Sequence, residues 1–229
     1  MNLLNSQGSA HEGSATQRAY LTLRSMIVTG VLKPGEKLKI DTLRHRLETG
    51  ASPIREALSL LTSDNLVERL DQRGFRAAEV SAGNFNEILA LRCTLENMAL
   101  RESIANATET WEENIVLAHH RMQKAHGSGL ENFEMQHKAF HMALLDNAVS
   151  PILLKFCTQL YDLNIRYRYL AGKGMNYQNR DVSDEHNGIL QAAVSRDADT
   201  ACARLLEHYR TTGAFLSDLL GEQALTGAE

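Results

Sequence analysis

The scarcity of proline restricts the fold of this chain more than any other feature of its sequence. Only three prolines and 15 glycines occur among 229 residues. Proline breaks helix interiors and glycine marks turns, so their scarcity leaves long uninterrupted stretches in which helix is favoured over strands and turns. We therefore expect a mostly α-helical protein.

The composition is that of a folded protein in a reducing compartment. Hydrophobic residues make up 43% of the chain and charged residues 23%, which allows a sizeable core and argues against disorder. Three cysteines without C-x-x-C spacing exclude a disulfide framework and a cysteine-based zinc site. No signal peptide is visible, and no apolar run reaches the roughly 18 residues that span a bilayer. We expect a cytoplasmic protein without a membrane partner, and a disordered tail over residues 1–15.

The charge is divided unevenly along the chain. The formal net charge of −4 argues against a nucleic-acid partner when it is taken as an average. Residues 1–80, however, hold eleven Lys and Arg against nine Asp and Glu, a net charge of +2, whereas residues 81–229 hold thirteen against nineteen, a net charge of −6. Seven of the nine histidines also follow residue 118. The two parts are therefore expected to have different partners.

The first part alternates short elements that are separated by turn signals. Asp41 is predicted to cap one helix and Ser52 to cap the next, with Pro53 in the first turn, where its missing N–H is tolerated. In order, the pattern predicts a helix over 16–29, a turn over 33–36, a strand over 37–40, a helix over 41–47, a helix from residue 52 and a hairpin over 66–80. This order is that of a winged helix-turn-helix domain, which we place at residues 16–80.

The second part has a helical pattern throughout. Helices are predicted near 84–107, 110–125, 129–146, 151–171, 183–194 and 197–220. Thr110 with Glu113 forms a possible capping box, Ser150 caps a helix that begins with Pro151, and the run Gly172-Lys173-Gly174 ends that helix. Amphipathic helices joined by turns predict an all-α antiparallel bundle over residues 81–229.

Basic residues of the first part are arranged for DNA binding. The second helix of a helix-turn-helix enters the major groove with its N-terminal side chains. Arg55 lies on the face of that helix opposite Ile54 and Leu58, where its guanidinium can form a fork with guanine or phosphate. The alternative is a solvated basic face in which Arg55 pairs with a nearby glutamate. The residues predicted to contact DNA are Arg44, Arg46, Ser52, Arg55, Arg73 and Gly74.

Histidines form a second group. His137 and His141 are four residues apart, so on a helix they share one face and are spaced for metal chelation. His186 and His208 lie on two later helices, which an antiparallel arrangement can bring to the same point. The alternative is that these are ordinary packed or solvated histidines, because i, i+4 pairs are common on helix surfaces.

Motifs of the common enzyme classes are absent from the sequence. The run from His137 to His141 lacks the glutamate of H-E-x-x-H, so no general base accompanies the pair. G-x-S-x-G, a Walker lysine loop and G-x-G-x-x-G are also missing. We therefore expect a protein that is not an enzyme. A metal-dependent all-α hydrolase with an accessory nucleic-acid-binding domain is the alternative.

Several runs resemble the GntR family of bacterial transcription regulators. The paired signatures are Gly30-Val31-Leu32-Lys33-Pro34-Gly35-Glu36-Lys37-Leu38 and Ser52-Pro53-Ile54-Arg55-Glu56-Ala57-Leu58. Arg73-Gly74-Phe75 followed by Leu91-Arg92-Cys93-Thr94-Leu95-Glu96 is similar to the FadR subfamily, whose helical FCD-type effector domain follows the wing. Within it, Gly50-x-x-Pro53, His137-x-x-Phe140-His141 and Arg166-Tyr167-Arg168-Tyr169 are most similar to the CsiR-type regulators of glutarate and related C4–C5 metabolism.

The resemblance implies a metal site in the helical domain. Many FadR-type effector domains hold a metal with one aspartate and three histidines, and His141, His186 and His208 match the three histidines. His137 stands in the place of the aspartate, so four neutral imidazoles would leave a divalent site at about +2 rather than about +1. Such a site should hold an anionic effector more strongly. The expected metal is zinc, with nickel as the alternative. A second departure, Ala51 in the place of a DNA-contacting arginine, implies a different operator.

Arginines and tyrosines complete the expected anion pocket, because an arginine fork matches a carboxylate and a tyrosine hydroxyl adds a neutral hydrogen bond. The predicted effector-binding residues are Arg92, Arg166, Arg168, Tyr167 and Tyr169. Arg166 and Arg168 point about 200° apart on a helix, so one of them is expected to face solvent. The resemblance implies a homodimeric repressor that binds operator DNA and senses a small carboxylate such as a C4–C5 dicarboxylate or hydroxy acid.

Overall fold

The computed structural model describes residues 13–71, 73–171 and 181–226, with side chains described as far as Ser217. Nine helices and three strands fall within these ranges, so the prediction of a mostly helical fold is confirmed. The chain divides into two compact units, and the boundary in the sequence lies between Glu79 and Val80. None of the helices in the described ranges is long and apolar enough to cross a membrane.

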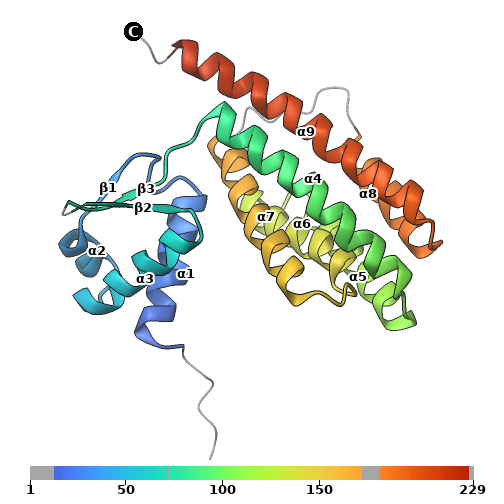
Figure 1. Ribbon diagram of the computed structural model, residues 1–229, viewed down its shortest axis with the longest axis horizontal. Helices are drawn as coiled ribbons and strands as arrows, with labels where there is room; N and C mark the ends of the chain where they lie inside the picture. The colour runs from blue at the N-terminus through green and yellow to red at the C-terminus, as the bar shows by residue number, and fades with distance from the viewer. Residues whose placement is uncertain (1–12, 72, 172–180, 227–229) are drawn as a thin grey trace, which may run out of the picture. The chain divides into compact units, whose positions relative to one another are not determined.

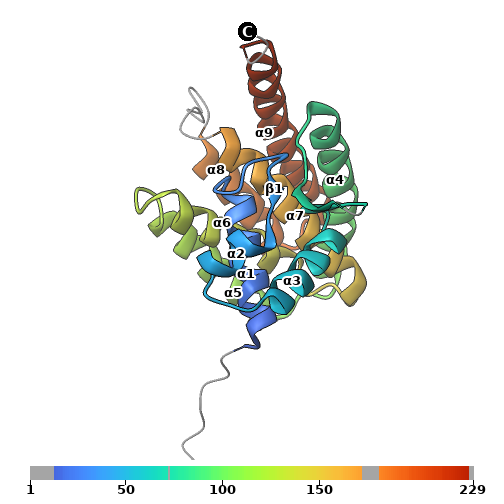
Figure 2. The same cartoon turned by 90° about the vertical axis from the view of Figure 1, so that its left-hand side faces the viewer.

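The first unit is the winged helix-turn-helix that the sequence predicts. Its elements are α1 (Ala15–Val28), β1 (Lys37–Leu38), α2 (Ile40–Arg46), α3 (Ala51–Ser63), β2 (Val67–Leu70) and β3 (Gly74–Ala77). The strands form an antiparallel sheet in the order β1-β3-β2, and the three helices lie on one side of it (Figures 1 and 2). Leu23 and Ile27 of α1 are buried, as are Ile54, Leu58 and Leu61 of α3, and the two helices pack together.

The caps predicted for two helices of this unit were wrong. Helix α3 begins at Ala51 with Gly50 as its N-cap, so Ser52 lies inside the helix, where its hydroxyl contacts Glu56 at 3.3 Å. Pro53 is then the third helical residue and has no N–H for a side-chain cap to satisfy, which explains why a glycine serves there. Helix α2 likewise begins at Ile40, so Asp41 lies in its first turn, where a carboxylate favours the helix dipole.

The second unit is a bundle of six helices. They are α4 (Ala82–Ala105), α5 (Glu109–Lys124), α6 (Leu130–Leu145), α7 (Pro151–Ala171), α8 (Val182–Val194) and α9 (Ala198–Thr226). Figure 1 shows the two long helices α4 and α9 side by side, with α7 on the other side of α4, and α8 also packs on α9. The predicted helix bounds agree with these to within a few residues except at the end of α9.

Local signals at the helix ends of the bundle were only partly interpreted correctly. The Ser150 hydroxyl accepts a hydrogen bond from the Leu153 amide at 3.4 Å, as its predicted capping role requires. The capping box at Thr110 and Glu113 was wrong, because Thr108 caps α5 by accepting a hydrogen bond from the Trp111 amide at 3.1 Å. The run Gly172-Lys173-Gly174 lies outside the described residues.

The interior of the bundle is polar at one point. Apolar side chains such as Phe140, Leu144 and Leu205 form most of the core. Helices α4, α6, α7, α8 and α9 also bury ionisable or amide side chains, namely Arg92, Glu96, Glu134, His137, His141, Asn164, Arg166, Arg168, His186 and His208. Burying such groups costs free energy unless they are paired. Their concentration in one domain marks the place where a functional site is expected.

Candidate metal centre and nucleic-acid interface

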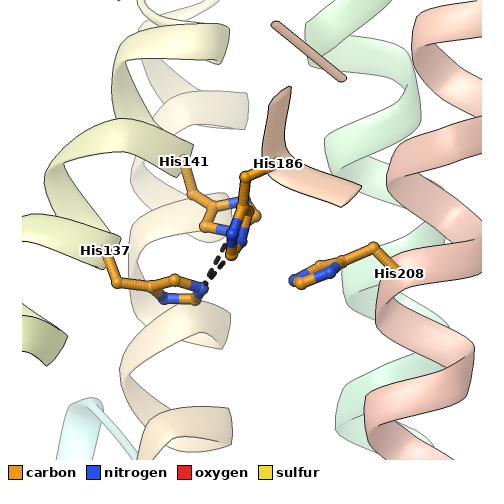
Figure 3. A group of neighbouring side chains, drawn as sticks. All are labelled: His137, His141, His186 and His208. Carbon is orange, nitrogen blue, oxygen red and sulfur yellow. Dashed lines mark hydrogen bonds between the residues drawn. The ribbon is translucent and has the colours of Figure 1, made fainter. Parts of the chain in front are cut away.

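Four histidines from three helices converge inside the bundle. His137 and His141 project one turn apart from α6, His186 comes from α8 and His208 from α9 (Figure 3). All four side chains are buried, and one ligand nitrogen from each lies within 4.8 Å of the others. The predicted histidine set is therefore brought together in full.

The nitrogen spacing matches what a metal requires. The Nε2 atom of His137 lies 3.2 Å from Nε2 of His141 and 3.2 Å from Nε2 of His186. Zn–N bonds of about 2.05 Å in a tetrahedral arrangement place neighbouring ligand nitrogens about 3.3 Å apart. The donor type of the four imidazoles and both distances from His137 therefore fit a divalent metal, and the four ligand nitrogens all lie within 4.8 Å of one another.

Outer hydrogen bonds orient three of the four rings. Nδ1 of His137 lies 2.6 Å from the Tyr161 hydroxyl, and Nδ1 of His141 lies 2.9 Å from the Tyr209 hydroxyl. Nδ1 of His208 lies 2.8 Å from a carboxylate oxygen of Glu185. With each Nδ1 engaged on the outside, the Nε2 atoms face the common centre. Such partners fix the ring orientation of metal-binding histidines.

The electrostatics of the cluster favour neutral imidazoles. Burial lowers the pKa of His137 and of His141 well below the usual value, and the neighbouring histidines lower both further. A neutral imidazole has a lone pair that can bind a metal, whereas an imidazolium does not. His137 and His141 are therefore in the neutral form that a metal ligand requires.

Two buried arginines lie beside the histidines. Arg92 donates to Glu96 at 2.6 Å and to Asn164 at 2.9 Å, and its guanidinium lies between the rings of Tyr161 and Tyr209 at 4.8 Å and 4.1 Å. Arg168 pairs with Glu134 at 2.7 Å. Burial raises the pKa of Glu134, and Arg168 opposes that rise.

One narrow cavity joins the arginines to the histidines. Its polar side is lined by Arg92, His137, Asn164, Arg168 and His208, and its apolar side includes Phe85, Leu89 and Leu216. The space open to water-sized molecules is only about 10 Å³. A cavity of that size holds about one water molecule, so a larger ligand must widen it.

The other predicted effector residues on α7, Arg166, Tyr167 and Tyr169, are not among the residues that line this cavity. Arg166 and Arg168 are both buried, at 3% and 9% exposure, so the expectation that one faces solvent was wrong. Helices α4, α6 and α9 all contact α7, so more than one neighbour covers its side chains. Tyr167 donates a hydrogen bond to Asn84 at 2.7 Å and so ties α7 to the start of α4. Tyr169 is half-buried.

Sequence reasoning missed the groups that hold the site together. They are Glu96, Glu134, Tyr161, Asn164 and Tyr209. Glu96 follows Arg92 by four residues, and this helical ion-pair spacing was a usable signal. Glu134 precedes His137 by three residues in the same way. Nothing in the local sequence indicates the roles of the two tyrosines or of Asn164.

The basic residues of the first unit are available for DNA. Arg55 is exposed on α3, opposite the buried Ile54 and Leu58. The adjacent Glu56 accepts hydrogen bonds from Thr16 at 2.7 Å and from Ser52 at 3.3 Å. The carboxylate next to Arg55 is thus already engaged, which favours the DNA-binding interpretation over the solvated pair.

The other predicted DNA contacts are on the surface as well. Arg46 is exposed at the end of α2, and Arg44 lies 3.6 Å from Asp41 in an exposed ion pair. Arg73 and Gly74 are exposed at the tip of the hairpin between β2 and β3, where Gly74 has a φ of 94° that favours glycine. These positions can contact a phosphate backbone.

The buried histidines predict that the chelator-treated protein loses stability as the pH falls. His137 and His141 stay neutral in the folded protein, whereas both take up a proton in the unfolded chain near pH 6.5. The unfolded state binds more protons below that pH, so the free energy of unfolding should fall by about 1.4 kcal/mol per pH unit for each histidine. Urea unfolding from neutral to mildly acidic pH, with EDTA present, measures this slope.

A double variant, His137→Gln with His141→Gln, is the control for this slope. It should show a smaller loss of stability over the same pH range, because glutamine does not titrate. The shifted pKa of Glu134 acts in the opposite sense, but that carboxyl is present in both proteins and its effect cancels. Equal slopes in the two proteins would contradict the prediction.

Comparison with known families agrees with both units. Residues 15–76 match the family described as "Bacterial regulatory proteins, gntR family". Residues 87–211, more than half of the chain, match the family described as "FCD domain". The two matches cover the winged helix-turn-helix and the helical bundle respectively.

Individual relatives are also transcription regulators. The chain is 33% identical over 204 residues to the uncharacterized HTH-type transcriptional regulator BphR of Paraburkholderia xenovorans (strain LB400), covering 86% of this chain and 82% of that protein. It is 30% identical over 200 residues to the HTH-type transcriptional repressor GlaR of Escherichia coli (strain K12), covering 84% and 91%. The solved structure of E. coli McbR/YncC matches the fold with a TM-score of 0.79 over 90% of this chain and 98% of that one, at 24% identity.

These matches decide between the two functions left open by the sequence. The matched gntR family and these relatives are regulators rather than enzymes, which decides against the metal-dependent hydrolase. The winged helix-turn-helix followed by a helical domain agrees with the two matches. The chain belongs to the GntR family of bacterial transcription regulators, with an N-terminal winged helix-turn-helix and an FCD effector domain.

Proposed function

We propose that this regulator is a homodimeric repressor whose FCD domain binds a small carboxylate next to a zinc ion. The observation that carries the proposal is the convergence of His137, His141, His186 and His208 next to a cavity that His137, His208 and two arginines line. A metal site and an anion-binding site in the same cavity allow one small ligand to contact both. Repression is supported by the relative GlaR of E. coli, which is described as a transcriptional repressor.

Charge balance favours an anionic effector. Each arginine that lines the cavity has a carboxylate partner, Glu96 for Arg92 and Glu134 for Arg168, so these pairs add no net charge. Four neutral imidazoles supply no negative charge of their own against the +2 of a divalent ion, and the Glu185 carboxylate contacts His208 from the outer side. A carboxylate supplies negative charge together with the planar geometry that an arginine fork matches. The expected C4–C5 acids are larger than the space now open in the cavity, so their binding would require the cavity to widen.

The donor set favours zinc, with nickel as the second choice. Imidazole nitrogens suit zinc, nickel and copper, whereas magnesium, calcium and manganese prefer oxygen donors. In this cavity the metal would supply positive charge that attracts the carboxylate. His137, His141, His186 and His208 would hold it through their Nε2 atoms, which face the common centre.

Arg55, near the start of α3, would contact the bases of operator DNA. A recognition helix inserts its N-terminal side chains into the major groove, and Arg44, Arg46, Ser52, Arg73 and Gly74 would add contacts around it. An effector changes operator affinity only if it binds the DNA-competent and DNA-incompetent states with different affinities. A bacterial regulator that binds operator DNA must be in the cytoplasm with that DNA, so we propose a cytoplasmic location.

A homodimer is supported by apolar side chains left exposed on the bundle. Helices α4 and α7 pack together, and both expose large hydrophobic residues: Leu91 and Met98 on α4, and Ile152 and Phe156 on α7. Exposed apolar residues on neighbouring helices are typical of an interface. Two copies would present two recognition helices to operator half-sites about one helical turn apart.

Replacing Arg55 should weaken specific operator binding. The variant Arg55→Ala removes the guanidinium that can form a bidentate contact with guanine, worth about 1–3 kcal/mol, or roughly 5- to 150-fold in affinity per half-site. A gel shift at fixed salt, with DNA from upstream of the gene, measures the change. Arg121→Ala on α5, which removes an exposed arginine from the other unit, should leave affinity unchanged. Equal binding by wild type and Arg55→Ala would exclude α3 as the recognition helix.

Charges introduced on α7 should separate the dimer. The variant Ile152→Glu with Phe156→Glu places like charges in the proposed interface, so light scattering after gel filtration should show a monomer. A matched control is Val116→Glu with Leu117→Glu, which changes two comparably exposed apolar residues on α5 and should leave the dimer intact. A dimeric α7 variant, or a wild-type monomer, would refute this interface.

Zinc and carboxylate binding should depend on each other. Metal analysis should find one zinc per chain in the wild type, little in His141→Ala, and a normal amount in His120→Ala, which changes an exposed histidine. A thermal-shift screen of small mono- and dicarboxylates should find a stabilising acid whose effect disappears with a chelator. His137→Asp should retain zinc but bind that acid more weakly, because the site loses one positive charge.

Three results would overturn parts of this proposal. A carboxylate that stabilises the protein equally with and without chelator would place the effector site apart from the metal. Absence of zinc and nickel from the wild-type protein, even after addition of the metal salts, would leave the histidines with a packing role. Unchanged acid affinity in His137→Asp would refute the charge argument.

A further inference from the structure

We propose that Tyr209 is a positioning residue for the metal centre: together with Glu96 it holds His141 in the ring tautomer whose Nε2 atom can bind a metal. The inference rests on the proposed metal site and adds a hydrogen-bonded relay from α4 through α9 to α6. It assigns a function to a tyrosine that no sequence motif indicates.

The relay is a continuous chain of four buried side chains. Arg92 donates from Nε to Oε1 of Glu96 at 2.6 Å. The other oxygen of Glu96, Oε2, accepts from the Tyr209 hydroxyl at 2.5 Å. The same hydroxyl lies 2.9 Å from Nδ1 of His141. All four residues are at most 5% exposed, so water does not compete for these contacts.

The direction of each hydrogen bond follows from counting protons. Glu96, as the carboxylate partner of Arg92, offers only acceptor oxygens. The single proton of the Tyr209 hydroxyl must therefore point to Glu96. The oxygen of that hydroxyl can then only accept from His141, which requires the proton of the neutral imidazole to be on Nδ1. The lone pair of His141 is thereby left on Nε2, facing His137 at 3.2 Å and the centre of the cluster.

His137 and His208 have outer partners of a different kind. For His208 the partner of Nδ1 is the carboxylate of Glu185 itself, so no intermediate residue is needed. For His137 the partner is the hydroxyl of Tyr161, which can donate or accept and has no carboxylate partner in the described part of the chain. Of these three histidines, His141 is the one whose tautomer depends on a carboxylate two contacts away.

The ring and the hydroxyl of Tyr209 make different contacts, so their roles can be tested separately. The ring packs on the Arg92 guanidinium at 4.1 Å, a contact that phenylalanine keeps. Only the hydroxyl joins Glu96 to His141. A change from tyrosine to phenylalanine therefore removes the relay and retains most of the packing.

Zinc affinity is the first test. Tyr209→Phe should bind zinc about 10- to 100-fold more weakly than the wild type in competition with a chromophoric chelator, the range observed when an outer partner of a metal ligand is removed. Tyr167→Phe is the matched control, because it removes another buried tyrosine hydroxyl of the same domain, one bonded to Asn84 rather than to a histidine. Its zinc affinity should stay within about twofold of the wild type. Wild-type affinity in Tyr209→Phe would overturn the proposal.

The histidine tautomer is the second test, and it needs no metal. Long-range ¹H–¹⁵N spectra of the chelator-treated protein should show His141 with its proton on Nδ1 in the wild type, and a shift toward the Nε2–H form in Tyr209→Phe. Glu96→Gln should cause the same shift, because the glutamine amide can donate to Tyr209 and reverse the hydrogen bond. A purely structural role would change stability but not the tautomer.

The two measurements distinguish failure of the relay from failure of the metal site. An unchanged tautomer in Tyr209→Phe would refute the relay, whether or not zinc binds. If the tautomer changes in Tyr209→Phe but the wild-type protein binds no zinc, the relay is supported and the proposed metal centre is not.

Discussion

The buried ion pair between Arg92 and Glu96 organises the polar interior of the FCD domain. Removing one member of such a pair leaves an uncompensated charge, at a typical cost of about 3–5 kcal/mol, so the pair is stable only with further partners. Asn164 takes another donor of Arg92, two tyrosine rings cover the guanidinium, and Tyr209 donates to Glu96. These partners come from α7 and α9, so the ion pair determines which faces of those helices turn inward.

The proposed metal centre depends on the same constraint. Tyr161 and Tyr209 contact Arg92 through their rings and contact His137 and His141 through their hydroxyls. Both groups therefore have fixed positions relative to the arginine. A helical bundle can hold such a site in its core because facing helices project side chains to one point. The arginine and the histidines thus form a single network rather than two adjacent sites.

The sequence predicts local features of this structure well and distant ones poorly. Helix α7 has its predicted bounds because Ser150 and Pro151 mark its start, and the spacing of His137 and His141 indicated a shared face. Glu96 and Tyr209 are 113 residues apart, and no periodicity connects them. The prediction that one of Arg166 and Arg168 faces solvent failed for a similar reason. The exposure of a helix face depends on which distant helices pack against it, and the local sequence does not indicate this.

Helix α4 gives the proposed effector site a direct connection to the DNA-binding unit along the chain. It begins at Ala82, just after the boundary between the units, and carries Arg92 less than three turns later. The Tyr167 hydroxyl anchors the start of α4 to α7 through Asn84. A ligand that displaces α4 therefore acts on the segment that leads into the winged helix. Because such coupling is reciprocal, an effector that weakens operator binding by a given factor must itself bind the operator complex more weakly by the same factor.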